Sequence, residues 1–341
     1  MSETIPARGI PGQSSTSILG NAVLRREDAT LVRGRGEFVA NQPFDDLIHA
    51  HFVRSTAAHG EILSIDVEDA RSMPGVVAVY TADDLGLDDR PPPMGFYAAE
   101  AIRPFLARDR VRFVGEPLAV VVAETAYQAA DAAESVWADI EPLTAVVSIH
   151  DAVAAETVLF EARDDNVMWQ IPSAGAIDFS GCDVVVTEEL WNSRVAAVSI
   201  EPRVVAASFA DGKLTYWASS QGTHDFRDGA AKCLGMDPAD VRVLVKDIGG
   251  GFGAKGMISE EEVIVGQLAR LIGRPVRWVE GRTENLSAYV HGRAQAQTVT
   301  IGGNRDGRVT HYRLDVVQDC GAYPKWGAFL PEFTRQLASG V

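Results

Sequence analysis

The sequence predicts an α+β fold, in which a mixed region of strands and helices precedes a region richer in antiparallel strands. Strand patterns alternate with helix patterns up to about residue 150. Further along, two Asp-Gly pairs each separate two β-rich runs, and a glycine-rich loop stands between a strand and a helix. These observations favour two domains built around sheets, with a ligand-binding loop in the second domain.

Composition limits the classes of protein to which the chain can belong. Its 341 residues are enough for one large or two ordinary domains, and a net charge of −16 argues against nucleic acid or an anionic membrane as the main partner. Three widely spaced cysteines give no disulfide framework. Because the N-terminus lacks a secretory signal and no apolar run could span a bilayer, we expect a cytoplasmic protein without membrane insertion.

The first part of the chain divides into a short arm and a mixed α/β domain. Residues 1–20 are expected to form a mobile arm, because this stretch is rich in Gly, Pro and Ser. Residues 21–150 are expected to form the first domain, with a helix that Thr125 and Gln128 cap at its N-terminus. Its strands are predicted near residues 46–54, 76–80 and 118–123.

The second domain, residues 151–341, is predicted to be rich in hairpins. Asp211-Gly212 and Asp306-Gly307 are the two residue pairs that most strongly indicate tight hairpin turns. The strands that they connect are predicted at residues 204–209, 214–218, 298–301 and 308–314.

The most informative segment is residues 246–256, where five glycines occur in eleven residues. An apolar strand, residues 241–245, leads into this loop, and Ser259 with Glu262 forms the capping box of the helix that follows. Successive N–H groups without side chains can form a concave nest that holds an oxyanion or a sulfur atom. The segment therefore predicts a cofactor-binding loop.

Gln221 is a second candidate for the same site. It lies where a predicted strand ends and a helix opens, with Thr223 as the expected N-cap. A neutral carboxamide has two donors and one acceptor, so it can hydrogen-bond a metal-oxo group without ligating the metal. We therefore place Gln221 on a rigid corner from which its amide can reach a ligand.

A dinucleotide site is the main alternative for the glycine loop. Residues 251–256 match G-x-G-x-x-G, and Glu280 lies about where the ribose-binding acid of an NAD-linked dehydrogenase belongs. Against this alternative, the chain turns into hairpin strands from about residue 294, whereas a doubly wound domain would continue with another crossover helix and parallel strand.

Taken in order, the motifs resemble the large, molybdenum-binding subunit of the molybdenum hydroxylases, which include xanthine dehydrogenase, aldehyde oxidase and aerobic carbon monoxide dehydrogenase. The resemblance covers nearly the whole chain. In the first domain it rests on Arg54-Ser55 with His59, on residues 73–76 and on residues 114–117. In the second domain it rests on residues 221–224, 247–255, 274–278 and 319–324.

The resemblance implies the fold and the site residues. Residues 21–150 would form an α/β hammerhead domain, and residues 151–341 the first half of a molybdopterin-binding domain. Gln221 would donate a hydrogen bond to an oxo ligand of molybdenum. Phe252 would shape the environment of the metal, and backbone N–H groups would hold the pyranopterin and the ligands of the metal, in a site made by Gly250, Gly251, Phe252 and Gly253. No side chain of the chain would ligate the metal directly.

The resemblance also implies the reaction and the partners. The family hydroxylates carbon monoxide, an aldehyde or a heteroaromatic compound with water as the oxygen source. Its catalytic glutamate lies near the end of a subunit more than twice as long, so no catalytic residue is expected in this chain, and the chain alone is expected to be inactive. The cofactor would be molybdopterin or its cytosine dinucleotide form, with FAD on a medium subunit and [2Fe-2S] clusters on a small subunit.

Two further hypotheses stay open at this stage. The chain could be a non-catalytic relic or an assembly module that folds without a cofactor. It could also be an NAD-linked dehydrogenase that uses the fingerprint at residues 251–256. Bound molybdenum and pterin, no cofactor at all, or bound NAD would distinguish the three.

Overall fold

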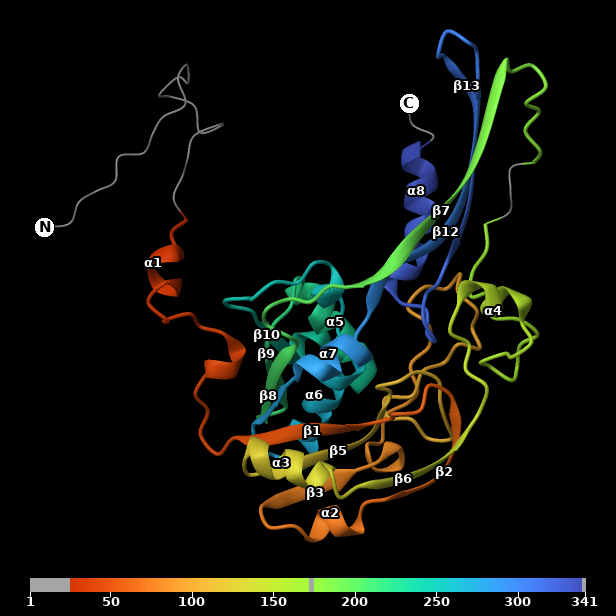
Figure 1. Cartoon of the computed structure of the whole chain (residues 1–341). Coiled ribbons are helices and arrows are strands. Elements are labelled where there is room, and N and C mark those ends of the chain that lie inside the picture. The colour runs from red at the N-terminus through yellow and green to blue at the C-terminus, as the bar shows by residue number, and fades with distance from the viewer. Residues whose placement is uncertain (1–24, 172–174, 339–341) are drawn as a thin grey trace, which may run out of the picture.

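A seven-stranded mixed sheet forms the centre of the computed structural model, which describes residues 25–171 and 175–338 (Figure 1). Strands from both predicted domains form this one sheet, because β1 pairs in parallel with β11 on one side and antiparallel with β5 on the other. The order of strands is β10 (Val241–Leu244), β9 (Lys213–Ala218), β8 (Val204–Ala210), β11 (Val276–Val279), β1 (Ile48–Arg54), β5 (Pro117–Ala123) and β3 (Val76–Tyr80). The predicted arm, residues 1–20, lies outside the described residues.

The N-terminal region adds a small sheet and two helices at the β3 end of the large sheet. α3 (Ala126–Ala133) packs against β1 and β5, and Thr125 caps it by accepting a hydrogen bond from the N–H of Gln128 at 3.2 Å, as predicted. The small sheet has the order β4 (Arg110–Val111), β2 (Gly60–Asp66) and β6 (Trp137–Pro142), and α2 (Glu68–Ser72) leads into β3.

Two longer helices cover the other end of the large sheet. α5 (Thr223–Leu234) connects β9 to the parallel strand β10, and α6 (Glu260–Ile272) packs against β8 and β11. Their buried residues join the main core, whose largest members include Trp278, Tyr216, Phe226, Ile264 and Leu268. The predicted N-cap of α5 is wrong by one residue: Gly222 is the cap, and Thr223 is the first helical residue.

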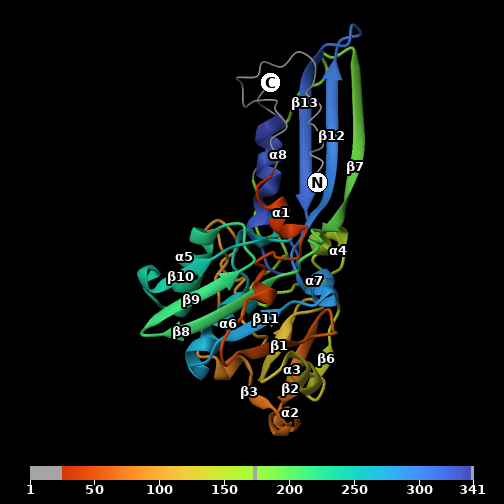
Figure 2. The same ribbon diagram turned by 90° about the vertical axis from the view of Figure 1, so that its left-hand side faces the viewer.

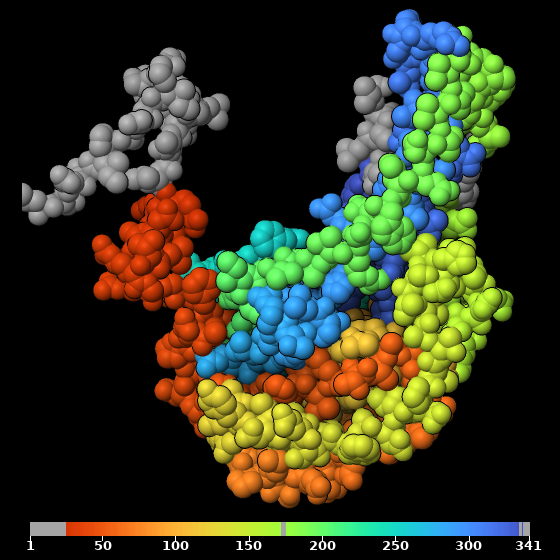
Figure 3. Space-filling view, viewed as in Figure 1, coloured from red at the N-terminus to blue at the C-terminus, as the bar shows by residue number. Residues whose placement is uncertain are grey.

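A three-stranded antiparallel sheet projects from this body, with α8 (Leu330–Ala338) beside it (Figures 1 and 2). We call β7 (Val184–Ala196), β12 (His291–Gly303) and β13 (Val309–Gln318) the projecting sheet. The hairpin between β12 and β13 turns at Asp306-Gly307, and the hairpin between β8 and β9 turns at Asp211-Gly212, as predicted. In the space-filling view of Figure 3 the projecting sheet stands clear of the body.

The remaining described helices are short and lie in the connections. The α-helices among them are α1 (Asp28–Leu31), α4 (Ile149–Ala154) and α7 (Arg282–Ala288). The 3-10 helices are η1 (Val39–Asn41), η2 (Ala82–Asp84), η3 (Pro238–Asp240), η4 (Ala254–Gly256) and η5 (Trp326–Phe329). The predicted α+β class is confirmed, because helices accompany sheets in which most strand pairs are antiparallel.

Candidate functional site

The glycine loop connects β10 to η4 and α6 and has an unusual backbone. Gly250 and Gly253 have φ values of 103° and 86°, which only glycine adopts without strain. Between them Phe252 has φ of 53°, the left-handed region that a residue with a bulky side chain rarely occupies. The Phe252 side chain is 75% exposed, so apolar burial does not account for this conformation. The loop is held in a shape that turns main-chain atoms and one aromatic ring outward.

The loop presents N–H groups that have no partner within the described chain. The N–H groups of Gly250, Gly251 and Phe252 donate no hydrogen bond there, whereas Gly249 N donates to Glu201 Oε2 at 2.9 Å. Consecutive free donors of this kind attract anions and other electron-rich atoms. Unpartnered donors at three successive residues are compatible with the nest that the spacing of the glycines predicts, which stays a prediction.

Gln221 lies directly against this loop. Its N–H donates to the carbonyl oxygen of Lys255 at 2.9 Å, and its Oε1 accepts from the N–H of Gly253 at 2.9 Å. Because the side-chain oxygen is occupied, the amide nitrogen remains as an outward donor. Gly251 makes the approach possible, since a Cβ at that position would lie 2.5 Å from Gln221 Cδ. The structure therefore brings together all five predicted residues, with the N–H of Gly253 used internally.

A buried lysine anchors the loop from below, and sequence reasoning missed its partners. Lys255 is 3% exposed, and its Nζ donates to the backbone oxygen of Glu201 at 2.8 Å and to Ser219 Oγ at 2.6 Å. Burial lowers the pKa of Lys255, while the Glu201 carboxylate at 3.2 Å favours its charged form. Glu201 also accepts from Gly249 N, so one ion pair fixes both ends of the loop. No local pattern in the sequence marks Glu201 for this role, because its partner lies 54 residues further along the chain.

The three glutamates that open α6 are buried, and two of them, Glu260 and Glu261, belong to an ionic network. The sequence predicted the capping box of Ser259 and Glu262, which the structure confirms, but not the burial of the three carboxyl groups. In the structure each is at most 4% exposed, and Glu261 binds Arg203 at 2.7 Å and Arg54 at 3.0 Å. Burial disfavours the ionised carboxylate, but these two guanidinium groups outweigh it and hold the pKa of Glu261 well below its usual range.

The acid proposed for ribose binding belongs to the same network. Glu280 is 2% exposed and accepts hydrogen bonds from the Arg203 backbone and side chain, each at 2.9 Å, and from Asn285 at 2.8 Å. The strand that ends at Glu280, β11, pairs antiparallel with β8 instead of lying beside β10. Neither the ribose acid nor the adjacent parallel strand of a dinucleotide fold is therefore in place.

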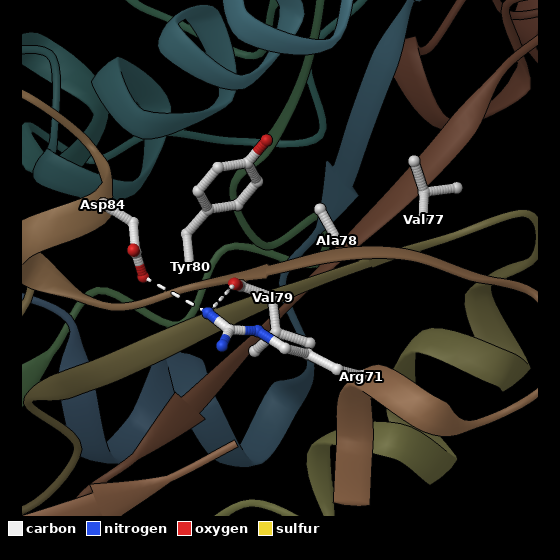
Figure 4. A pocket seen from close by; sticks show the side chains of 6 residues that line it. All are labelled: Arg71, Val77, Ala78, Val79, Tyr80 and Asp84. Carbon is white, nitrogen blue, oxygen red and sulfur yellow. Dashed lines mark hydrogen bonds and ion pairs between the residues drawn. The ribbon is translucent and has the colours of Figure 1, made fainter. Parts of the chain in front are cut away.

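Two other kinds of site are less well supported in the described residues. No group of three or more His, Cys, Asp or Glu side chains there is placed to hold a metal ion. A depression of about 420 Å³ lies at β3, at the opposite end of the sheet from β10, and Figure 4 shows the side chains that line it. Its charged groups satisfy each other, because Arg71 donates to the Val79 oxygen and pairs with Asp84 at 3.7 Å.

Comparisons with known proteins identify the family of each region of the chain. Residues 33–144 match the family model described as the a/b hammerhead domain of aldehyde oxidase and xanthine dehydrogenase. Residues 159–341, more than half of the chain, match the model described as the molybdopterin cofactor-binding domain. No described helix has the length and apolar character that crossing a membrane requires.

Individual relatives extend over nearly all of the chain. It is 36% identical to the nicotine 6-hydroxylase large subunit of Paenarthrobacter nicotinovorans, over 90% of this chain and 39% of that protein. It is 32% identical to the carbon monoxide dehydrogenase large chain of Hydrogenophaga pseudoflava, over 87% of this chain and 39% of that protein. The chain thus spans about two fifths of the length of these relatives.

Solved structures give the same assignment. The crystal structure of quinoline 2-oxidoreductase from Pseudomonas putida 86 superposes with a TM-score of 0.84 at 34% identity, over 89% of this chain and 40% of that one. At this level of identity both the fold and the order of the motifs are shared. The chain belongs to the molybdenum hydroxylase family and corresponds to the N-terminal part of its large, molybdopterin-binding subunit.

Proposed function

We propose that this chain forms one wall of the cofactor pocket in a molybdenum hydroxylase, with Gln221 and residues 250–253 in contact with the cofactor. The observation that carries the proposal is the row of free N–H groups at Gly250, Gly251 and Phe252 beside an amide that the loop itself orients. Neutral donors suit a cofactor that brings its own sulfur ligands, since the protein then needs only to hold and orient it.

The residues fit a molybdenum–pyranopterin group. When bound, that group supplies the oxygen-transfer and two-electron chemistry. The Gln221 amide nitrogen would donate to an oxygen on the metal, and the three N–H groups would hold electron-rich atoms of the cofactor. The exposed ring of Phe252 would exclude water from one side of the site. Lys255, buried beneath the loop, would keep the donors aligned.

The reaction proposed is the two-electron oxidation of carbon monoxide, an aldehyde or a heteroaromatic compound with water as the oxygen source. Nicotine 6-hydroxylase and quinoline 2-oxidoreductase, two of the similar proteins, are named for heteroaromatic substrates. The catalytic base would come from the polypeptide that corresponds to the other three fifths of the relatives. Electrons would leave to [2Fe-2S] and FAD subunits, and the cofactor would be molybdopterin or its cytosine dinucleotide. We place the assembled enzyme in the cytoplasm, since the three cysteines are free thiols.

The projecting sheet supports the need for more polypeptide. Val186, Ile301 and Tyr312 are in register across its three strands and expose 49%, 39% and 39% of their surface. Leu190, four residues after Val186 on β7 and therefore on the same face, is 51% exposed. Exposed apolar side chains gathered in this way on a projecting sheet indicate an interaction surface. We propose that the remainder of the large subunit covers it.

The test is the molybdenum and pterin content of the assembled enzyme carrying Gln221→Ala. Because the amide both orients the loop and donates to the cofactor, we expect the content to fall by about tenfold or more. Gln42→Ala is the matched control, because the Gln42 side chain makes no hydrogen bond within the described residues. Its backbone carbonyl accepts from Arg277 at 3.0 Å, and its N–H donates to the Val39 oxygen at 3.2 Å. Full molybdenum content and activity in Gln221→Ala would disprove the role of the amide. Wild-type enzyme without metal or pterin would instead favour an assembly module.

A further inference from the structure

A cysteine and a histidine meet at the far end of the projecting sheet, away from the glycine loop. Cys182 lies in a turn just before β7, where its N–H donates to the carbonyl oxygen of Phe179 at 3.0 Å. Its Sγ is 3.2 Å from Nδ1 of His311 on β13. These residues are 129 positions apart, so the fold of the projecting sheet creates the pair.

The surrounding residues make room for the thiol and orient the imidazole. Gly302 on β12 stands opposite His311, and a Cβ there would lie 2.5 Å from Cys182 Sγ. Thr310 Oγ1 lies 2.9 Å from the same imidazole nitrogen and 3.7 Å from the sulfur. The Phe179 ring, 5.8 Å from the imidazole ring, packs beside the pair. The thiol is thus held next to a base in a partly exposed position.

Within the part of the chain that the structure describes, neither of the other two thiols contacts a histidine nitrogen. Burial raises the pKa of Cys233, which packs against the main core. Burial and then the nearby Asp319 carboxylate raise the pKa of Cys320 to about 12. Since the thiolate is the nucleophile, both should react slowly at neutral pH.

We propose that Cys182 is a site of reversible thiol modification, with His311 as the base that accepts its proton and disulfides of the glutathione class as the reagent. His311 Nδ1 takes the thiol proton, and Cys182 Sγ attacks one sulfur of the disulfide. A new sulfur–sulfur bond forms as the old one breaks, and the other half of the reagent leaves as a thiolate that takes a proton from the imidazolium or solvent. The reagent is reduced as Cys182 is oxidised.

The test is the rate at which each cysteine reacts with oxidised glutathione at pH 7, followed by peptide mass spectrometry on the folded 341-residue chain. We expect Cys182 to be modified at least about tenfold faster than Cys233 or Cys320. His311→Gln should slow the reaction of Cys182 by about tenfold while the rates of the other two cysteines stay the same. Unchanged rates at those two cysteines also show that the variant is folded.

Two results would overturn the proposal. One is modification of Cys182 no faster than that of the other thiols. The other is a folded His311→Gln chain in which Cys182 reacts as in the wild type, which would show that exposure alone sets the rate. Thr310→Val, which keeps the imidazole, should retain most of the reactivity. None of these outcomes depends on whether the glycine loop binds a cofactor.

Discussion

At the scale of single residues, two glycines of the loop differ in the space available for a side chain. A Cβ added at Gly251 would clash with the Gln221 side chain, whereas a Cβ added at Gly256 would meet nothing within 4 Å. Both glycines belong to the same loop, and neither has a positive φ. They therefore form a matched pair for separating the effect of a side chain on the site from its effect on the fold.

Gly251→Ala should weaken cofactor binding with little loss of stability. The new Cβ pushes the flexible end of Gln221, so we expect the free energy of unfolding to change by about 1 kcal/mol or less. The displaced amide would no longer accept the hydrogen bond from the N–H of Gly253, and its nitrogen would no longer be positioned to donate to the cofactor. Molybdenum content of the assembled enzyme and urea unfolding of the same sample measure the two effects.

Gly256→Ala is the control and should leave both quantities near the wild-type values. If Gly251→Ala also retained its molybdenum, the close approach of Gln221 to the loop would have no role in binding. A large loss of stability in Gly251→Ala would show that the Gln221 side chain is not free to move.

The residues of the site were only partly predictable from sequence. Gln221 and the glycines could be found because each belongs to a local pattern, a strand end or a run of residues without side chains. Glu201 could not, because its importance arises from Lys255, 54 residues away, and from burial that no local pattern encodes. The left-handed backbone of Phe252 was hidden for the same reason, since its aromatic side chain alone indicates a core residue.

At the scale of elements, α6 links the ionic network to the glycine loop. The guanidinium of Arg203, bound to Glu261, stacks 4.1 Å from the centre of the Tyr289 ring. The hydroxyl of Tyr289 in turn donates to the backbone oxygen of Ala254 in η4. The start of α6 thus supports the loop through an aromatic side chain as well as along the chain.

The capping box at the start of α6 predicts an unusual dependence of stability on pH. Glu262 Oε2 accepts from the backbone and hydroxyl of Ser259, at 2.7 and 2.9 Å. Burial nevertheless raises the pKa of Glu262 to about 7, outweighing Arg203 and the cap. Because the folded-state pKa lies above the ordinary value near 4.5, this group stabilises the fold most at low pH and loses that contribution between pH 4.5 and 7.

Glu262→Gln should remove this pH dependence, because the amide oxygen keeps the cap without a charge. The free energy of unfolding of the variant minus that of the wild type should rise by up to about 3 kcal/mol from pH 4.5 to pH 8. Urea unfolding at the two pH values measures the gain. Glu262→Ala, which lacks the cap, should be less stable than Glu262→Gln throughout. A constant difference between wild type and Glu262→Gln would mean that the Glu262 carboxyl is not perturbed.

Sequence patterns predicted the helices and hairpins better than they predicted which of their side chains are buried. The capping box of α6, the Thr125 cap of α3 and both Asp-Gly hairpins are confirmed, because each signal lies within a few residues. The burial of three consecutive glutamates was not predicted, since the cations that pair with Glu260 and Glu261 come from other elements. They are Arg54, Arg90, Arg103 and Arg203. Consecutive glutamates at the start of a helix predict exposed side chains unless their distant cationic partners are known.

At the scale of the whole molecule, the two regions that match different family models share one sheet. The parallel pairing of β1 with β11 joins them, and Arg54 from the first region reaches Glu261 in the second. The division near residue 150 stays a prediction about domains. The pairing of the strands, however, indicates that the two regions unfold together.

Arg203→Met should therefore destabilise both regions equally. Arg203 is 2% exposed, and its loss leaves the carboxylates of Glu261 and Glu280 buried with fewer partners, at a cost of about 3–5 kcal/mol. Native-state hydrogen exchange measures the effect separately in β5 and β8. We expect amide protection in both strands to fall by the same factor, because both are exposed only when the common sheet opens.

Arg274→Met is the control for this experiment. Arg274 also connects the two regions, since it binds Glu124 at 2.8 Å, but Glu124 is exposed and water can replace the lost partner. This variant should leave protection nearly unchanged. If Arg203→Met lowered protection in β8 and left β5 at its wild-type level, the two regions would be independent folding units despite the strand pairing between them. The ionic network would then stabilise only the region that contains the cofactor loop, and Arg203→Met would leave the stability of the N-terminal region unchanged.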